Sequence, residues 1–128
     1  MIVALDTSSL VAFLSGNEGD DIEYVDAFLA AGTIVLSPIV LTEILSDPKL
    51  PKSVSQFIQK IPRLEVMEGY WHRTAVLRAA VISKSLKARL GDALIAQSCI
   101  DHAVPLITRD RDYRHFAKFG ELKIYAGG

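Results

Sequence analysis

The segment Ile2-Val-Ala-Leu-Asp-Thr-Ser-Ser-Leu10 is the first indication of the fold class, because a short apolar run leads directly into an aspartate followed by three hydroxyl side chains. Four more apolar runs of similar size follow along the chain. The five runs are Ile2–Leu5, Thr33–Leu36, Leu64–Met67, Pro105–Thr108 and Leu122–Tyr125. Each is rich in Val, Ile or Leu, which is typical of strands that are covered on both faces.

Helical patterns separate these runs. Asp21–Ala31 carries apolar residues at helical spacing and stops at Gly32, a common helix end. Ser37-Pro38 is typical of a helix cap followed by proline at the first helical position. Two further helices are predicted over Tyr70–Ala88 and Asp92–Ala103. Strands that alternate with helices predict an α/β fold, a three-layer α/β/α sandwich around a parallel sheet.

Length and composition limit the class of protein. The chain has 128 residues, half of them hydrophobic, which predicts a single domain over residues 1–128 and excludes a disordered linker. Cys99 is the only cysteine, so an internal disulfide framework and a multi-cysteine zinc site are excluded. No apolar run is long enough for a membrane span and the N-terminus does not resemble a signal peptide. We therefore expect a soluble, cytoplasmic protein with no membrane partner.

Four acidic residues occupy positions that favour a binding site. Asp6 and Asp110 follow predicted strands, and ligands of open α/β sheets bind beyond the carboxyl ends of the strands. Asp92 opens a predicted helix. Glu43 lies within the apolar segment Ile39–Leu45, where burying a carboxylate is costly unless a cation or hydrogen-bond donors meet it.

These four carboxylates predict a metal site. No Lys or Arg lies within about one helical turn of Glu43, so a divalent metal is the economical partner. Ligands that are oxygen only suit Mg²⁺ or Mn²⁺ better than zinc or copper. Taken singly, Asp6 or Asp92 is more often a helix cap than a ligand, and only the four together favour a site.

At these residues the chain resembles a known family. The matching segments are Leu5-Asp-Thr-Ser-Ser-Leu10, Val40-Leu-Thr-Glu-Ile-Leu45, Leu90-Gly-Asp-Ala-Leu-Ile-Ala-Gln97 and Leu106-Ile-Thr-Arg-Asp-Arg-Asp112. In this order and spacing they resemble a PIN domain, specifically the VapC-type toxin ribonucleases of type II toxin–antitoxin systems. Any one segment alone is weak, but the four together cover essentially the whole chain.

The resemblance implies both a fold and a site. It implies a central five-stranded parallel sheet with the first and fourth strands adjacent in the middle. It places the acidic quartet of the family on Asp6, Glu43, Asp92 and Asp110. It also assigns supporting roles to three residues: Ser8 as a polar helper, Thr7 as the neighbouring cap, and Thr108 as a hydrogen-bond partner of a carboxylate. Asp112 could be an outer acid, but general surface statistics favour a solvated loop acid at this position.

The resemblance further implies metal-dependent endonucleolytic cleavage of RNA. Mg²⁺ or Mn²⁺ held by the acids would activate a water against the scissile phosphate. A homodimer and a cognate antitoxin are implied as partners. The chain has no G-x-S-x-G elbow, P-loop or G-x-G-x-x-G motif that would indicate another chemistry.

A basic segment could supply contacts to RNA. The chain from Gly69 to Gly91 carries five bases and no acid. On one long helix Arg73, Lys84 and Lys87 would form a stripe able to hold phosphates. Arg109 and Arg111 flank Asp110 and could also contact the backbone. A solubilising helix face is the alternative interpretation.

Charge is divided between the two parts of the chain. Residues 1–50 contain eight acids and one base, and residues 51–128 contain seven acids and thirteen bases. The net charge of −1 therefore conceals an acidic part and a basic part.

Three alternatives to a toxin ribonuclease remain open. One is a nuclease of the same fold that acts in RNA maturation or on DNA, which the four acids do not distinguish. A second is a non-catalytic module that binds metal or nucleic acid, although such a module has no need to keep four repelling carboxylates. A receiver-type phospho-switch is disfavoured, because adjacent acids after the first strand and a lysine after the last are both missing.

Overall fold

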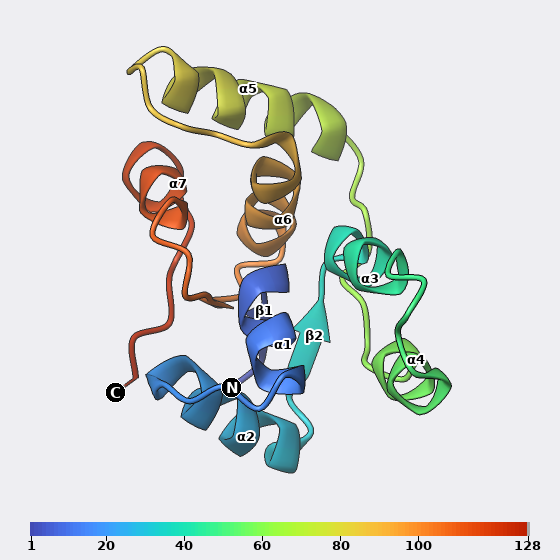
Figure 1. The fold of residues 1–128 in the computed structure, drawn as a ribbon. Helices are drawn as coiled ribbons and strands as arrows, with labels where there is room; N and C mark the ends of the chain where they lie inside the picture. The colour runs from blue at the N-terminus through green and yellow to red at the C-terminus, as the bar shows by residue number, and fades with distance from the viewer. Residues whose placement is uncertain (128) are drawn as a thin grey trace.

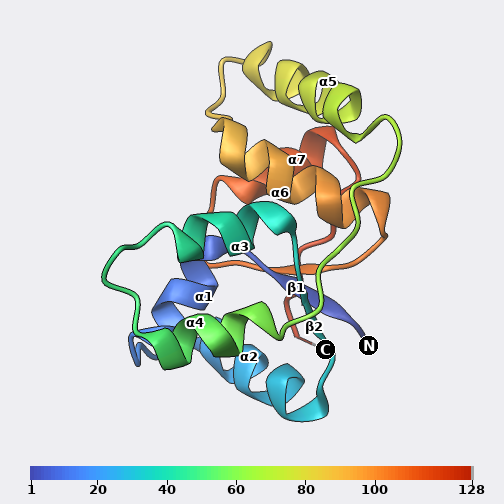
Figure 2. The same ribbon diagram turned by 90° about the vertical axis from the view of Figure 1, so that its right-hand side faces the viewer.

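A short parallel sheet lies between two sets of helices in the computed structural model, which describes residues 1–127 (Figures 1 and 2). The three strands are β1 (Val3–Leu5), β2 (Ile34–Leu36) and β3 (Leu106–Ile107), as far as the described residues go. The helices of this part of the chain are α1 (Thr7–Leu14), α2 (Asp20–Ala31), α3 (Pro38–Leu45), α4 (Lys52–Gln59), α5 (Tyr70–Ile82), α6 (Leu90–Asp101) and α7 (Tyr113–Phe119). The predicted α/β class and parallel sheet are confirmed.

The strand order is β2-β1-β3, with β1 parallel to both neighbours. Leu5 is paired with Leu36 on one side and with Ile107 on the other. All three residues of β1 are fully buried, as expected of a central strand. The first and fourth predicted strands are thus adjacent, and their carboxyl ends open on the same edge of the sheet.

The prediction of five strands is wrong. Near the predicted segment Leu64–Met67 there is one parallel bridge, between Leu36 and the preceding residue Arg63, and Leu122–Tyr125 contributes one, between Leu106 and Ile124. Of the first segment only Leu64 is buried, and the next three side chains are exposed. The segment therefore has too little apolar surface to extend along β2, and it leaves the sheet after one residue.

Helices cover both faces of the sheet. α1 and α2 pack together on one face, and α5, α6 and α7 pack together on the other (Figures 1 and 2). α3 continues from the end of β2 and contacts both α1 and α6. The core runs through the sheet, with Leu10 and Val25 buried below it and Ile95 and Phe116 buried above it.

The boundaries of two helices differ from the prediction by two residues or more. The long helix predicted over Tyr70–Ala88 ends at Ile82, and the next helix begins at Leu90 rather than at Asp92. Ser85 has a φ of 59°, a left-handed conformation that a continuing α-helix cannot contain. Residues 83–89 therefore form a loop, which the Nε of Arg78 holds by donating to the carbonyl of Ala88 at 2.8 Å.

Other helix ends were predicted closely. The Ser37 side chain accepts from the backbone N–H of Ile39 at 3.3 Å, with Pro38 at the first helical position. Gly32 ends α2 in the left-handed conformation. None of the helices within residues 1–127 combines the length and apolar character needed to cross a bilayer.

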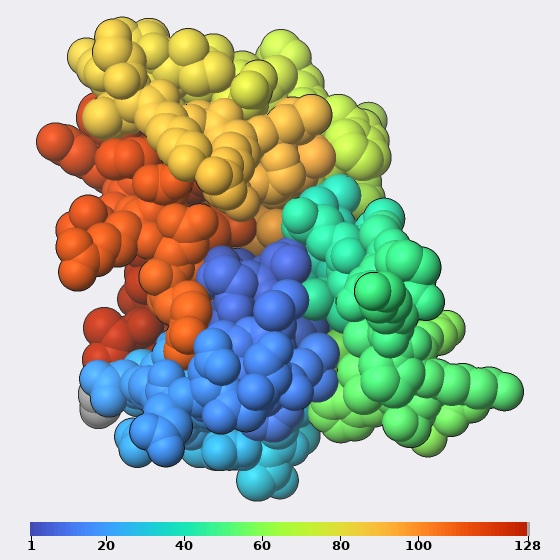
Figure 3. Space-filling view, viewed as in Figure 1, coloured from blue at the N-terminus to red at the C-terminus, as the bar shows by residue number. Residues whose placement is uncertain are grey.

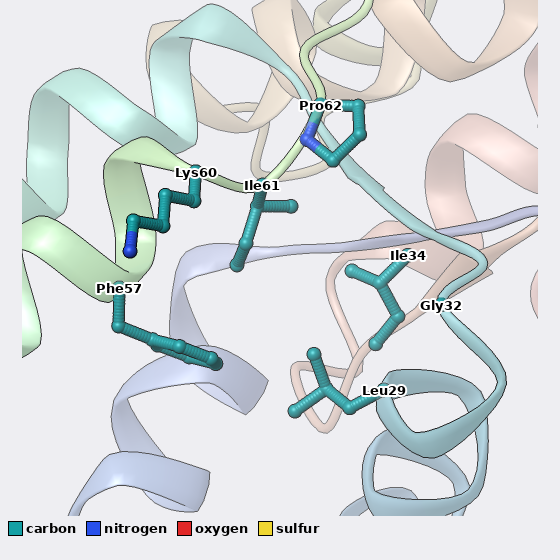
Figure 4. A pocket seen from close by; sticks show the side chains of 7 residues that line it. All are labelled: Leu29, Gly32, Ile34, Phe57, Lys60, Ile61 and Pro62. Carbon is teal, nitrogen blue, oxygen red and sulfur yellow. The ribbon is translucent and has the colours of Figure 1, made fainter.

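An apolar hollow of about 270 Å³ lies between the end of α2 and the end of α4 (Figure 4). Leu29, Ile34, Phe57 and Ile61 line it together with Gly32, Lys60 and Pro62. Ile34 is the first residue of β2, so this hollow lies at the amino end of that strand. The acidic residues of interest follow the carboxyl ends of the strands, and the hollow is separate from them.

Candidate functional site

Asp6 stands where β1 ends and α1 begins, and it is almost completely buried. Its Oδ1 accepts a hydrogen bond from the backbone N–H of Ser9 at 2.9 Å. Its Oδ2 accepts from the Ser8 hydroxyl at 2.6 Å and from the Thr108 hydroxyl at 2.7 Å. Burial raises the pKa of Asp6, and these three hydrogen bonds oppose that increase by stabilising the carboxylate. Asp6 is therefore both a helix cap and a firmly oriented carboxylate.

Thr108 joins the ends of β1 and β3. Its hydroxyl donates to Asp6 and accepts from the backbone N–H of Asp110 at 3.0 Å. Asp110 Oδ1 in turn accepts from the backbone N–H of Asp112 at 2.9 Å, which closes a tight local turn. One hydroxyl group thus fixes Asp6 and Asp110 relative to each other.

Asp92 lies in the first turn of α6 and is half-buried. Its Oδ1 accepts from the Tyr113 hydroxyl at 3.3 Å. Its Oδ2 is buried and has no hydrogen-bond partner within residues 1–127. Burial and the nearby charge of Asp110 raise the pKa of Asp92. A buried carboxylate oxygen without a donor is costly unless a further ligand meets it.

Tyr113 and Ser9 are site residues that sequence reasoning missed. The Tyr113 side chain is fully buried, and burial raises the pKa of its phenol. A tyrosine three residues after Asp110 was an available indication, because a buried phenol needs an acceptor. Ser9 lies within the first quoted segment, and its Oγ donates to Asp21 Oδ2 at 3.0 Å.

The expected burial of Glu43 is wrong. α3 presents Val40 and Ile44 to the core, and Glu43 is exposed at the flank of that face. Its Oε1 accepts from the Thr7 hydroxyl at 2.8 Å. Its Oε2 lies 3.7 Å from where a Cβ on Gly91 would stand, so Glu43 faces the start of α6 beside Asp92. Glu43 therefore borders the site without the desolvation that the sequence argument assumed.

Two of the residues predicted to contact RNA form ion pairs with aspartates instead. Arg73 forms a bidentate pair with Asp101, with nitrogen–oxygen distances of 2.9 and 2.6 Å. Asp101 is nine residues beyond Asp92 on α6, about 13 Å along the helix axis. Arg109 forms a bidentate pair with Asp21 on α2, at 2.8 and 2.9 Å. The stripe of Arg73, Lys84 and Lys87 does not exist, because α5 ends before either lysine.

Of the other residues predicted to contact RNA, Lys87 and Arg111 lie beside acidic residues. Lys84 and Lys87 are exposed in the loop between α5 and α6, and Arg111 is exposed directly after Asp110. Lys87 Nζ lies 3.6 Å from Asp112 Oδ2. Asp112 therefore contacts a cation with its carboxylate and the Asp110 side chain with its backbone.

The chemistry of the acids fits a divalent cation. Asp6, Asp92 and Asp110 repel one another, and Asp92 keeps an unpartnered oxygen. Carboxylate oxygens are the ligands that Mg²⁺ and Mn²⁺ take. As they stand, no three His, Cys, Asp or Glu side chains of residues 1–127 converge into a metal-holding group. A cation would have to draw the carboxylates together.

Comparisons with known proteins identify related folds. A family model of the PIN domain matches residues 3–119. The structure of VapBC2 from Rickettsia felis, bound to a DNA fragment from its promoter, is similar with a TM-score of 0.72, 25% identity and 98% coverage of each chain. No curated protein matches the sequence.

Two more distant structures share the fold. DNA-bound VapBC from Salmonella typhimurium has a TM-score of 0.69 at 20% identity, with 98% of each chain covered. VapBC-5 from Mycobacterium tuberculosis, a member of the VapBC family of toxin–antitoxin systems, has the same TM-score at 18% identity and the same coverage.

Proposed function

Because the chain belongs to the PIN domain family, we propose that it is a metal-dependent endoribonuclease and the toxin of a toxin–antitoxin pair. The observation that carries the proposal is the unpartnered Oδ2 of Asp92, buried beside Asp6 and Asp110. These carboxylates stand beyond the carboxyl edge of a parallel sheet, where α/β folds bind ligands. The similarity to VapBC2 at 25% identity supports the toxin assignment.

The proposed cofactor is Mg²⁺ or Mn²⁺, held by Asp6, Asp92 and Asp110 with Glu43 at the border of the site. When bound, such an ion lowers the pKa of a water molecule and offsets charge on a phosphate. The side chains around the acids fix their orientation. Ser8, Ser9 and Thr108 hold the Asp6 carboxylate, while Tyr113 holds one oxygen of Asp92 and leaves the other free.

A cognate antitoxin is the proposed protein partner. The similar structures from Rickettsia felis and Salmonella typhimurium are VapBC complexes bound to DNA. An apolar hollow of about 190 Å³ between α1 and α3, next to the Thr7–Glu43 hydrogen bond, is open to an apolar side chain of a partner. Val11 and Leu14 line it from α1, and Ile44 lines it from α3.

Cleavage of RNA by the purified chain tests the function. RNA is incubated in Mn²⁺, Mg²⁺ or EDTA, with single-stranded DNA of matching sequence in parallel. We expect discrete RNA fragments that require metal. Asp92→Asn should abolish them while preserving the fold, because the amide oxygen can still accept from Tyr113.

Asp26→Asn is the matched control for this experiment, since Asp26 is exposed on α2 away from the acids. It should cleave like the unmodified chain. Cleavage that persists in EDTA, or that Asp92→Asn leaves intact, would contradict the proposed site. Cleavage of the DNA alone would assign the chain to a different class of nuclease.

A further inference from the structure

The loop between α5 and α6 carries three cations and leads into the first turn of α6, which holds Asp92. Residues 83–89 contain Lys84, Lys87 and Arg89 and no acid, and all three side chains are exposed. Arg89 immediately precedes α6, and its charge acts on Asp92 three residues later. The hydrogen bond from Arg78 to the Ala88 carbonyl fixes the end of this loop. The cations are thus presented from a fixed backbone.

A second basic segment meets this loop. Arg111 directly follows Asp110 and is exposed, and the Nε of Arg114 donates to the Arg111 carbonyl at 3.2 Å. The 3.6 Å pair between Lys87 and Asp112 joins the two segments. Figure 3 shows the gold chain that precedes α6 lying against the orange chain that leads into α7. Within residues 1–127, Lys84, Arg89 and Arg111 form no ion pair.

The opposite side of the site has the opposite charge. Glu18, Asp20, Asp21 and Glu23 gather at the start of α2. The nearby cation is Arg109, and its guanidinium is held by Asp21 and by the Glu18 carbonyl at 3.1 Å. Ser9 links Asp21 to Asp6, so this acidic end borders the site. The remaining carboxylates there repel a phosphate chain.

We propose that single-stranded RNA enters over the basic rim formed by Lys84, Lys87, Arg89 and Arg111, and that the acidic start of α2 keeps it off the other side. This inference rests on the proposed ribonuclease function and assigns the substrate path to one side of the site. The contacts are to phosphates, so they position the strand without reading its sequence. They also bring the backbone to Asp92 and Asp110, which adjoin the rim in the chain.

Binding measured without catalysis tests the path. A short fluorescent single-stranded RNA is titrated with the chain in EDTA at several salt concentrations, and anisotropy gives the affinity. For single strands, each phosphate contact contributes about 0.7 to the slope of log K against log salt. Replacing Lys84, Arg89 and Arg111 together by Gln should lower that slope by about 2 and weaken binding at least ten-fold at low salt.

Two sets of variants control for net charge. Lys49→Gln, Lys52→Gln and Lys60→Gln together remove the same charge from exposed positions around α4, and should leave binding unchanged. Asp20→Asn with Glu23→Gln on α2 should strengthen it. If the rim variant and the α4 control variant weakened binding equally, or if the rim variant bound RNA normally, the proposal would be overturned.

The experiments can reject the proposed RNA path and the proposed ribonuclease function independently of each other. Metal-dependent cleavage with RNA affinity unaffected by the rim variant would retain the ribonuclease and reject the path, leaving the rim to an acidic protein segment. Rim-dependent binding of RNA without cleavage in any metal would retain the path and reject the enzyme.

Discussion

At the residue scale, Asp6 and Asp92 are held in different ways. Asp6 accepts three hydrogen bonds, whereas Asp92 accepts one and leaves Oδ2 unsatisfied. Asp6 therefore contributes to the fold as a cap as well as to the site. Asp92 makes fewer hydrogen bonds to the fold, and its buried Oδ2 is an unsatisfied acceptor that a ligand would stabilise.

Tyr113 should position Asp92. Tyr113→Phe removes one hydrogen bond without changing the packing, and should lower the free energy of unfolding by about 1 kcal/mol. Removing an outer partner of a metal ligand typically costs about ten-fold or more in metal affinity or activity. We expect a similar loss in cleavage rate and a higher Mn²⁺ concentration at the midpoint of the thermal shift.

Tyr24→Phe is the control for this prediction, because it removes a tyrosine hydroxyl that donates to the Ala126 carbonyl away from the acids. It should cleave RNA normally. If Tyr113→Phe also cleaves and binds Mn²⁺ like the unmodified chain, Tyr113 has only a packing role.

At the scale of elements, α5 and α6 are fastened together far from the acids. Asp101 accepts from Arg73 on α5 and from Gln97 on α6, and Arg73 also donates to the Glu68 carbonyl at 2.8 Å. The Arg73 guanidinium holds the pKa of Asp101 below the usual range of an aspartate. The residue predicted to hold RNA is therefore a link between two helices.

This link predicts a dependence of stability on pH. Since the pKa of Asp101 is lower in the folded chain than in the unfolded one, its contribution is complete at neutral pH and is lost as pH falls through the lowered pKa. Asp101→Asn should lower the free energy of unfolding at pH 7 by about 1 kcal/mol or less, because Arg73 is partly exposed.

Denaturant unfolding across pH checks this prediction. The difference between Asp101→Asn and the unmodified chain should shrink as the solution becomes acidic. Asp26→Asn serves as the control and should show no such difference at any pH. If the difference in free energy of unfolding between Asp101→Asn and the unmodified chain stays constant down to acid pH, packing and not the charge pair accounts for that difference.

Local sequence patterns predicted which helices and strands exist better than they predicted where each one begins and ends. The cap at Ser37 and the stop at Gly32 depend on neighbouring residues alone, so they could be predicted. The end of α5 could not, because Ser85 adopts its left-handed conformation in a segment with a continuing helical pattern. The sheet edges were overpredicted because pairing depends on burial against other elements, which Val66 and Met67 lack.

The candidate site likewise has features that the sequence could predict and features that it could not. Local patterns placed Asp6 and Asp110 after strands, and the resemblance to the PIN family implied that those two strands are adjacent. In the structure the Thr108 hydroxyl links the two acids. The partners of Arg109 and Arg73 lie 88 and 28 residues away along the chain, at distances in sequence that no local pattern reports. Glu43 was misjudged because apolar neighbours in sequence are not neighbours around a helix.

At the scale of the whole molecule, a bound cation should stabilise the fold. A ligand at a hundred times its dissociation constant adds about 2.7 kcal/mol to the free energy of unfolding. We expect Mg²⁺ or Mn²⁺ to raise the melting temperature by several degrees in differential scanning fluorimetry, and Asp92→Asn to lose that increase. An equal increase in the variant would place metal binding elsewhere.

Self-association should involve the outer face of α5. Trp71, Val76 and Ile82 are 62, 57 and 47% exposed on this helix, an unusual amount of bare apolar surface. We propose that the chain forms a homodimer, measurable by sedimentation velocity. Trp71→Glu should shift the population towards monomer, and Phe57→Glu on α4 is the control. A monomer at all concentrations would contradict this.

The bond between Thr108 and Asp6 has a consequence for the synthesis of this chain. Its two partners are 102 residues apart, so a ribosome has made most of the polypeptide before the bond can form. Any product truncated ahead of Leu106 lacks β3, Thr108 and Asp110, so its Asp6 has lost one of its three donors. A partly translated chain therefore carries no assembled acidic centre. If the full chain is toxic, termination ahead of Leu106 yields fragments without that activity, and the cell meets it only in copies that extend through Asp110.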